Sequence, residues 1–378
     1  MPSLCIRTLL LTASLCIFTT STASAASWTV QTTPEPSAGQ KRLRSVSCPS
    51  STACEAIGNT EGEKSWGDGW NGTTWTIQTV PSPSKEFARL FAVSCTAASE
   101  CTAAGKSEGQ ADQKSLAERW NGTSWTIQTT ASPKSILLDR FGAGVSCPSS
   151  TACTSVGEYE NEIGLDVTLA ERWTGTTWSK QTTVNSKEKE VQNALESVSC
   201  PSTTACMAVG IEWDALTFGD KPFAESWNGT SWTATKTPPA DFALTSVSCT
   251  ASNACSAIGG SEKEPAVDRW NGTEWSEQKL TKPEKAKEYE ISSISCTEAK
   301  ACTAVGDESR EVAKEKFEEI LFAENWNGTS WTVVSVPSPA EAVELGLSSV
   351  SCKTSTECMA VGFYWTKSAE HTLIERYH

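Results

Sequence analysis

The cysteine spacing is the sequence feature that most constrains the fold. Fourteen of the sixteen cysteines form seven pairs, and five residues separate the members of every pair. Successive pairs begin 47 to 56 residues apart. A period of this size indicates a propeller, a solenoid or an array of small modules. The pairs are Cys48/Cys54, Cys95/Cys101, Cys147/Cys153, Cys200/Cys206, Cys249/Cys255, Cys296/Cys302 and Cys352/Cys358.

Each unit repeats one order of segments. Each unit begins with "SVSC" or a variant, followed by five turn-like residues and "C-x-A-x-G". After these come a run that ends in Trp, a turn such as "NGT" and a second run that begins with Trp. Four short runs rich in Val, Ile, Thr and Trp indicate four antiparallel strands. We expect the five residues between the cysteines to join the first two strands. Four-stranded units of this length are typical of β-propeller blades.

The two ends of the chain predict how the ring closes. The seventh unit stops at "TLIERYH", before an outer strand, whereas Trp28 begins a "WTVQTTP" segment with no unit in front of it. A linear solenoid would instead end in polar caps. We therefore expect a seven-bladed β-propeller of four-stranded antiparallel blades, closed by the N-terminal strand pairing with the last blade, which leaves no free sheet edge.

The N-terminus indicates export. Residues 1–26 combine Arg7, an apolar run over residues 9–18 and an A-x-A site at residues 23–25, which is typical of a secretory signal peptide. We expect residues 27–378 to form a single secreted, extracellular domain without a membrane span. In an exported chain the paired cysteines predict disulfides, each worth roughly 2 kcal/mol in the chain-entropy model. The chain has only two histidines, so we expect no metal and no cofactor.

The charge balance bears on the partner. The chain has 31 basic and 45 acidic residues, and this excess of negative charge disfavours nucleic acid as a ligand. We expect a monomer whose partner is a protein or a cell-surface glycan.

The repeated "WNGTSW" phrase allows three interpretations. Asn-Gly favours the positive φ angles of a tight hairpin, and its two flanking tryptophans could pack against each other within and between blades. The same residues form glycosylation sequons at Asn71, Asn121, Asn228, Asn271 and Asn327, and exposed indoles would suit a sugar. The chain resembles secreted bacterial β-propeller repeat proteins with "SVSC-x5-C-x-A-V-G" and "AERWNGTSW" repeats, a resemblance that covers nearly all of the mature chain and implies no catalytic residue. More loosely, the hairpins are similar to those of propeller lectins, which implies carbohydrate binding.

One acidic residue precedes the first aromatic of every hairpin by two positions. We expect these carboxylates to be scaffold groups that bind backbone or an indole N–H of the adjacent blade, and the arginines at 119, 172, 269 and 376 to point to the opposite face. A pair of carboxylates at one site would instead allow glycoside hydrolysis. The acids are Asp68, Glu118, Glu171, Glu225, Asp268, Glu324 and Glu375.

The connections divide the propeller into two faces. The turns joining first to second and third to fourth strands have constant length, and we call their surface the hairpin face. The connections joining second to third strands and one blade to the next vary in length, and we call their surface the variable-loop face. Function usually resides in variable loops on a rigid scaffold. The candidate ligand-binding residues there are Tyr159, Trp213, Phe218, Tyr364 and Trp365, beside the acids Glu158, Glu160, Glu162 and Asp214.

Three functions fit these features. The leading hypothesis is a non-catalytic binding or scaffold module that recognises a protein or cell-surface ligand through the variable-loop face. The alternatives are a carbohydrate-binding propeller lectin and a glycoside hydrolase. The sequence shows no nucleophile elbow, zinc-protease or phosphate-loop motif, and we name no catalytic residue. The apolar spacing within residues 311–322 also predicts a short helix over the sixth blade.

Overall fold

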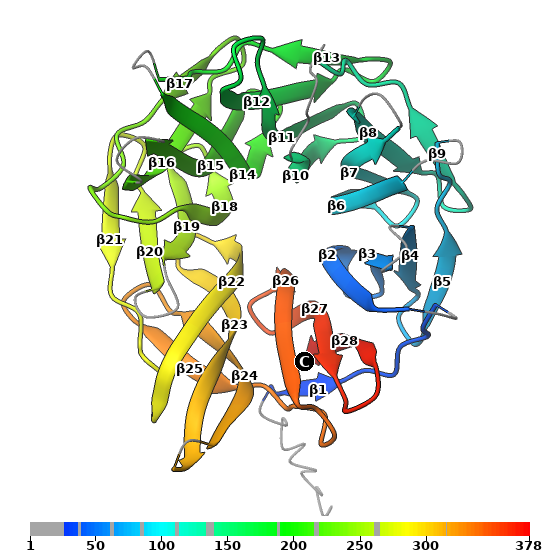
Figure 1. Cartoon of the computed structure of the whole chain (residues 1–378), viewed down its shortest axis with the longest axis vertical. Coiled ribbons are helices and arrows are strands. Elements are labelled where there is room, and N and C mark those ends of the chain that lie inside the picture. Colours follow the sequence, from blue (N-terminus) through cyan, green and yellow to red (C-terminus); the bar gives the residue numbers. More distant parts are fainter. Residues whose placement is uncertain are drawn as a thin grey trace, which may run out of the picture.

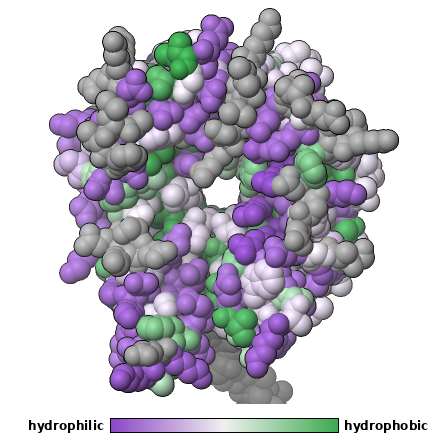
Figure 2. Space-filling view, viewed as in Figure 1, coloured by the Kyte–Doolittle hydropathy of each residue, from purple (hydrophilic) through white to green (hydrophobic). Residues whose placement is uncertain are grey.

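The computed structural model shows a ring of seven antiparallel sheets around a central channel (Figure 1). It describes residues 26–36, 39–60, 64–83, 87–109, 113–133, 140–186, 190–214, 219–260, 265–314 and 316–378. Every regular element among these residues is a strand. Figure 2 shows that the channel is open, with hydrophilic residues along the margin where Figure 1 places β2 and β6.

Each blade has four strands, the first of which lines the channel and the last of which lies at the rim. Blade 1 contains β2 (Lys41–Ser50), β3 (Ala53–Thr60), β4 (Ser65–Trp70) and β5 (Trp75–Thr79). Blade 2 contains β6 (Phe87–Ala97), β7 (Glu100–Glu108), β8 (Gln113–Trp120) and β9 (Trp125–Gln128). Blade 3 contains β10 (Arg140–Ser149), β11 (Ala152–Glu160), β12 (Asp166–Trp173) and β13 (Trp178–Gln181). Blade 4 contains β14 (Val191–Ser202), β15 (Ala205–Asp214), β16 (Gly219–Trp227) and β17 (Trp232–Ala234).

The remaining blades repeat this order. Blade 5 contains β18 (Leu244–Ala251), β19 (Ala254–Gly260), β20 (Pro265–Trp270) and β21 (Trp275–Gln278). Blade 6 contains β22 (Ala286–Glu298), β23 (Ala301–Ala313), β24 (Lys316–Trp326) and β25 (Trp331–Ser335). Blade 7 contains β26 (Glu344–Thr354), β27 (Glu357–Trp365), β28 (Glu370–Tyr377) and β1 (Trp28–Val30).

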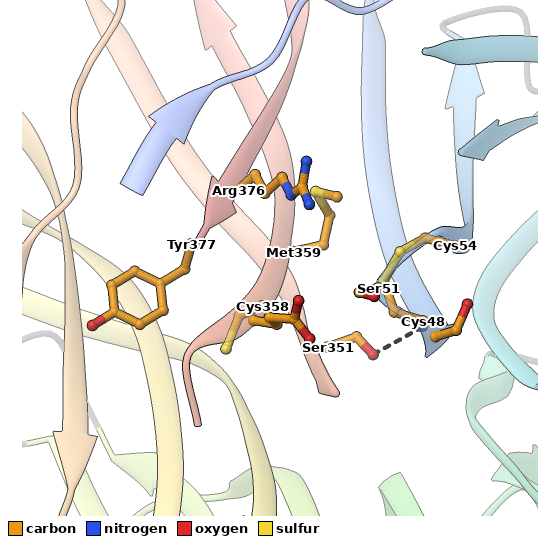
Figure 3. A pocket seen from close by; sticks show the side chains of 10 residues that line it. Cys48, Ser51, Cys54, Ser351, Cys358, Met359, Arg376 and Tyr377 are labelled. Carbon is orange, nitrogen blue, oxygen red and sulfur yellow. Dashed lines mark hydrogen bonds between the residues drawn. A yellow bond between two sulfur atoms is a disulfide. The ribbon is translucent and has the colours of Figure 1, made fainter. Parts of the chain in front are cut away.

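The predicted closure is confirmed. The N-terminal strand β1 supplies the outer strand of blade 7, where Trp28 lies opposite Tyr377 and Val30 opposite Glu375. The two ends of the chain therefore share one sheet, and β28 has a partner along both edges. Figure 3 shows the adjoining contact between blades 7 and 1, where Ser351 bonds to the backbone of Cys48.

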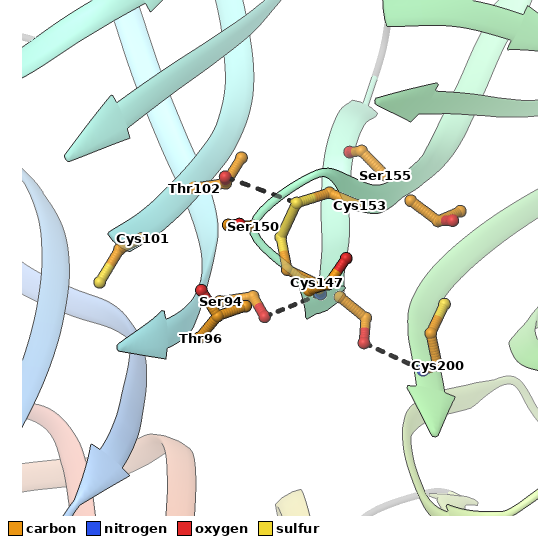
Figure 4. The surroundings of a disulfide bond; sticks show 12 residues. Ser94, Thr96, Cys101, Thr102, Cys147, Ser150, Cys153, Ser155 and Cys200 are labelled. Atoms are coloured by element: carbon orange, nitrogen blue, oxygen red, sulfur yellow. Dashed lines mark hydrogen bonds between the residues drawn. A yellow bond between two sulfur atoms is a disulfide. The ribbon is translucent and has the colours of Figure 1, made fainter. Parts of the chain in front are cut away.

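The "SVSC" repeat forms a ring of hydrogen bonds around the channel. In every blade the hydroxyl of the serine before the first cysteine accepts the backbone N–H of that cysteine in the next blade, at 2.9–3.0 Å. Figure 4 shows two of these bonds, from Cys147 to Ser94 and from Cys200 to Ser146. Because each bond joins two blades, the repeated serine fixes the spacing of neighbouring innermost strands.

The glycine of "C-x-A-x-G" permits a close approach between strands. A Cβ atom added to Gly105 would lie 1.8 Å from the carbonyl oxygen of Arg89, and one added to Gly306 would lie 1.8 Å from that of Glu290. Both oxygens belong to the innermost strand of the same blade, beside the register shift that each innermost strand contains. Only glycine leaves room for this bulged backbone.

The seven disulfides are confirmed, but the turn that they close is shorter than predicted. The cysteines lie within paired strands rather than at the ends of a five-residue turn, and Cys249 is directly opposite Cys255. Only two residues, such as Ser51 and Thr52, separate the first two strands of a blade. Because cystine can join facing residues of an antiparallel pair, the strands continue past the bridge.

The second cysteine of every bridge is a core residue. These seven cysteines are 1–5 % exposed. The Cys153 sulfur lies 3.5 Å from the Thr102 hydroxyl of the preceding blade, a contact drawn in Figure 4. The burial of these cysteines agrees with the structural role that the predicted disulfides imply. They are Cys54, Cys101, Cys153, Cys206, Cys255, Cys302 and Cys358.

The predicted helix is wrong. Residues 311–313 belong to β23 and residues 316–322 to β24, and the two strands pair with each other. Leu321 and Phe322 are both buried, although successive side chains of a strand point to opposite faces. A blade packed between two neighbours is buried on both faces, so consecutive apolar residues there imitate helical spacing. Nor does the described part of the chain contain a helix that could cross a membrane.

Candidate functional site

The hairpin tryptophans are structural. In six blades the two indole rings lie 5.5–5.9 Å apart, and apart from half-buried Trp270 they are 2–9 % exposed. The Trp70 indole donates to the Ser51 carbonyl, whereas the Trp125 indole donates to the Gln78 side chain of the preceding blade at 2.6 Å. These hydrogen bonds stabilise the turns and the blade interfaces. Because the indole faces other than that of Trp270 are buried, they are not exposed for stacking against a sugar.

The Asn-Gly-Thr turn differs from the prediction in one respect. Gly72 has a φ of +97°, but Asn71 is not among the described residues with positive φ. Instead the Asn71 side-chain oxygen accepts the backbone N–H groups of Thr73 and Thr74, at 3.0 and 2.9 Å, and the Thr73 hydroxyl at 2.8 Å. An Asx turn thus replaces the second left-handed residue. These hydrogen bonds stabilise the turn, which explains why the Asn-Gly-Thr sequence recurs.

All seven hairpin acids are buried, with exposures of 0–1 %. Glu171 accepts the Ala131 backbone N–H at 3.0 Å and the Ser115 hydroxyl at 2.9 Å, both from the preceding blade or the segment that leaves it. This arrangement confirms the predicted contact with the adjacent blade for Glu171. In the same way, Glu225 accepts the Val184 backbone N–H at 3.0 Å, and Glu324 accepts the Thr281 backbone N–H at 3.1 Å.

A proline occupies the donor position in the other four blades. The donor residue stands six positions after the outer-strand tryptophan, and proline at that position has no N–H to donate. Neither carboxyl oxygen of Glu118 or Glu375 has a donor among the described residues, whereas Asp68 accepts the Trp66 indole at 3.2 Å. The four combinations are Pro34 with Asp68, Pro81 with Glu118, Pro238 with Asp268 and Pro337 with Glu375.

Burial makes these carboxyls weak acids. Loss of water around the charged form raises the pKa of Glu118 and of Glu375 to about 8. The pKa of Glu225 and of Glu324 rises for the same reason, but their backbone donors limit the rise to about 7. Each acid lies sealed in a different blade, so they do not form the pair of carboxylates that glycoside hydrolysis needs.

The predicted ligand-binding residues do not converge. Tyr159 lines a hollow of 590 Å³ at the β11–β12 hairpin, and its hydroxyl accepts the Lys180 ammonium at 2.6 Å. Trp213 is the last but one residue of β15 in blade 4, whereas Tyr364 and Trp365 are the last two residues of β27 in blade 7. Phe218 lies outside the described residues. These aromatics therefore occupy three separate blades.

Tyr364 has a local packing role. Its ring stacks on His371 with 4.9 Å between the ring centroids, and the His371 ring nitrogen Nδ1 lies 2.9 Å from a Glu35 carboxylate oxygen. This contact ties the segment after β1 to blade 7.

A second hollow, which the sequence analysis missed, opens at the mouth of the channel. Its volume is 310 Å³, and Arg42 and Arg44 of β2 line it together with Arg89 and Phe91 of β6. The remaining lining residues are Gln40, Asn59, Thr60 and Glu370. The strands that carry the arginines begin on the variable-loop face, so we call this hollow the channel mouth.

Charge is concentrated at the channel mouth. Arg42 pairs with the buried carboxylate of Glu370 and lies 3.8 Å above the centre of the Phe363 ring. Arg44 is exposed to the channel, yet loss of part of its water and the positive charges of Arg42 and Arg89 lower its pKa, against the field of Glu370. Three guanidinium groups thus line one hollow, and the Glu370 carboxylate is also among its lining residues. A comparison of the seven repeats could have revealed this cluster, because most repeats lack arginine at these positions.

No protein-family model matches the chain. No curated protein matches it either. Among solved structures, the chain is similar to U3-55K, with a TM-score of 0.59, 10 % identity, and coverage of 93 % of this chain and 98 % of that one. It is also similar to YCF48 bound to a D1 peptide, with a TM-score of 0.57, 12 % identity, and coverage of 94 % and 98 %.

A third similar structure is an enzyme. The GH74 xyloglucanase of Xanthomonas campestris has a TM-score of 0.54 and 10 % identity, and the match covers 92 % of this chain and 53 % of the xyloglucanase chain. At these identities the similarities establish the propeller fold alone.

Proposed function

We propose that the chain is a secreted, non-catalytic module that binds a protein partner through the variable-loop face. Residues 1–26, most of which lie outside the described part, would be the export signal, and residues 27–378 the single binding domain. The seven disulfides support export, since such bonds persist in oxidising compartments. We propose a monomer, with Tyr159, Trp213, Phe218, Tyr364 and Trp365 as contact residues of this face.

The observation that carries the proposal is the long hairpin of blade 6. Strands β23 and β24 have 13 and 11 residues, whereas their counterparts β19 and β20 in blade 5 have 7 and 6. Figure 1 shows the resulting hairpin projecting from the ring. Near its tip, Val312 is 50 % and Phe317 44 % exposed. Exposed apolar groups on a projecting element suit a protein partner, and a similar propeller, YCF48, has been solved with a bound peptide.

The alternatives have less support. A lectin function relied on exposed hairpin indoles, and those rings are buried. A hydrolase function required two carboxylates in one pocket, and the hairpin acids are distributed one to a blade. The projecting hairpin therefore favours protein recognition over both.

Site-specific photo-crosslinking tests the proposal. A photoreactive phenylalanine analogue placed at position 317 is expected to capture a specific extracellular protein, because this ring lies exposed near the hairpin tip. The same analogue at Thr123, an exposed residue of a hairpin-face turn, is the matched control. A glycan-array signal without any crosslinked protein at position 317 would reject protein recognition in favour of the lectin function.

A further inference from the structure

Arginine recurs between the hairpin acid and the first aromatic of the hairpin, and its side chain reaches the next blade. The Cζ atom of Arg172 in blade 3 lies 5.3 Å from the centre of the Trp227 ring in blade 4. Arg269 in blade 5 lies over Trp326 in blade 6 at the same distance. A guanidinium is attracted to the face of an indole, so each arginine covers a tryptophan of the neighbouring blade.

The guanidinium also bonds to the cystine turn of the next blade. In three blades it donates to the carbonyl of the third residue after the first cysteine of that blade. Between blades 3 and 4, and again between blades 5 and 6, an indole face and a turn carbonyl therefore hold one guanidinium together. The bonds are Arg119 to Ser150 at 2.8 Å, Arg172 to Thr203 and Arg269 to Ala299.

Blade 4 has no arginine at this position. Ser226 replaces it, and the Ser226 hydroxyl donates to the Thr233 carbonyl of its own outer strand at 3.5 Å. In blade 5, Trp270 is half-buried, whereas the other hairpin tryptophans are buried. The Ser252 carbonyl, at the acceptor position of the turn, accepts the Trp270 indole N–H at 3.2 Å. Because a carbonyl oxygen has two lone pairs, it can accept a second bond.

A hollow of 620 Å³ opens at this interface on the hairpin face. Ser226, Trp270 and Ser252 are among its lining residues. The interface therefore presents the two groups that hold a guanidinium elsewhere in the ring, beside space that no arginine of blade 4 fills.

The interface between blades 7 and 1 is a matched comparison. Met359 lies opposite Arg376 there, as Met207 lies opposite Ser226 in blade 4. Arg376 lies 5.5 Å from the centre of the Trp70 ring, and Figure 3 shows it on the side of blade 7 that faces blade 1. The hollow that Arg376 lines has a volume of 20 Å³. The arginine thus accompanies a nearly closed interface, and serine an open one.

Two other blades lack the arginine, but neither leaves a tryptophan half-buried. In blade 1, a Cβ atom on Gly69 would meet the Gln78 amide, and Trp120 of blade 2 is 8 % exposed. In blade 6 the residue is Asn325, and the next aromatic is Tyr377. Among the described interfaces, the one between blades 4 and 5 therefore combines a missing arginine with a half-buried indole.

We propose that this hollow binds an arginine side chain of a partner protein, which stacks on Trp270 and donates to the Ser252 carbonyl. The site lies on the hairpin face, so it goes beyond the proposed function. The net charge of −14 attracts basic segments, and the volume is within the range of ligand pockets. A planar guanidinium suits an indole face and a fixed carbonyl better than an ammonium group does.

Ligand-observed fluorine NMR with the full mature protein tests this assignment. The probe is trifluoroacetyl-Gly-Ser-Arg-Ser-Gly-amide, and the control peptide replaces its arginine by citrulline, which has a similar shape without the charge. We expect only the arginine peptide to bind. Ser226→Arg fills the hollow from within and should raise the Kd at least tenfold, about 1.4 kcal/mol. Ser124→Arg adds the same charge at an exposed turn of blade 2 and should leave the Kd unchanged.

Other outcomes would overturn the assignment. Equal binding of the arginine and citrulline peptides would show that the charge is not recognised. Equal Kd values for Ser124→Arg and a folded Ser226→Arg would place the peptide elsewhere. If Ser226→Arg does not fold, retained binding by Trp270→Leu would exclude the indole face. Binding of a neutral monosaccharide without the arginine peptide would assign the hollow to a sugar. The crosslink from position 317 reports on the opposite face, so its failure and the failure of peptide binding are separate results.

Discussion

Glu118→Gln and Glu171→Gln are expected to change stability in opposite directions at neutral pH. Both glutamates are fully buried at the same position of neighbouring blades. Glu171 accepts an N–H from Ala131, whereas Pro81 stands in the place of Ala131 before Glu118. Glutamine keeps the shape of the neutral acid and cannot ionise, so each substitution isolates what the charge contributes at its site.

The magnitude for Glu118 follows from its raised pKa. The folded protein holds this proton more tightly than the unfolded chain does, so the free energy of unfolding is highest at low pH and decreases as the pH rises from about 4.5 to about 8. At about 1.36 kcal/mol per pKa unit, the wild type should lose about 4 kcal/mol relative to Glu118→Gln across that interval. Glu171→Gln loses a bond to Ala131 or Ser115 and should destabilise the fold by about 1–3 kcal/mol.

Urea denaturation monitored by tryptophan fluorescence, repeated from about pH 4.5 to 8, measures both effects. Pro81→Ala provides a further check, because the new backbone N–H should lower the Glu118 pKa and weaken the dependence on pH. A constant difference between wild type and Glu118→Gln over this range would refute the reasoning. The reasoning would also be refuted if the stability difference between wild type and Glu171→Gln changed more with pH than the difference between wild type and Glu118→Gln.

Three further predictions concern the scaffold. Gly105→Ala should destabilise the fold by roughly 2–4 kcal/mol, measured by thermal denaturation, because its Cβ would overlap the Arg89 carbonyl; an unchanged melting temperature would contradict the close approach. Deleting residues 26–34 removes β1 and exposes the edge of β28, so light scattering should detect association through that edge, and a monomer of wild-type stability would argue against the closure. Reduction of the disulfides should lower stability by roughly 2 kcal/mol per bridge, and denaturation with and without reductant checks this.

The ring could be predicted from the sequence because every blade repeats the same sequence pattern. The seven cysteine pairs indicated the blade count, and Trp28 in front of an incomplete last unit indicated the closure. Local conformation was less predictable. In place of the helix expected at residues 311–322, residues 311–313 extend β23 and residues 316–322 begin β24. The burial of both Leu321 and Phe322 removes the alternation that distinguishes a strand. Asn71 was assigned a positive φ that its side-chain hydrogen bonds make unnecessary.

The candidate site was less predictable than the ring. Aromatics near the variable loops were chosen by residue type, and the structure distributes Tyr159, Trp213 and Tyr364 over three blades. The channel mouth depends instead on Arg44 and Arg89, which are far apart in sequence and meet only because the ring places β2 beside β6. A single-unit motif search finds neither, since the signal is a departure from the repeat.

Comparing the seven blades distinguishes residues that the fold requires from residues that are free to serve binding. The serine that accepts a cysteine N–H occurs in all seven blades, so blade packing is sufficient to explain it. The buried acid also occurs in all seven, but proline removes its backbone donor in four, which makes the pKa of each acid depend on its own blade interface. Arg44 has no such structural reason, because the other six blades close the same ring with other residues at its position. Residues that packing does not require are the ones through which one propeller can differ from another in what it binds.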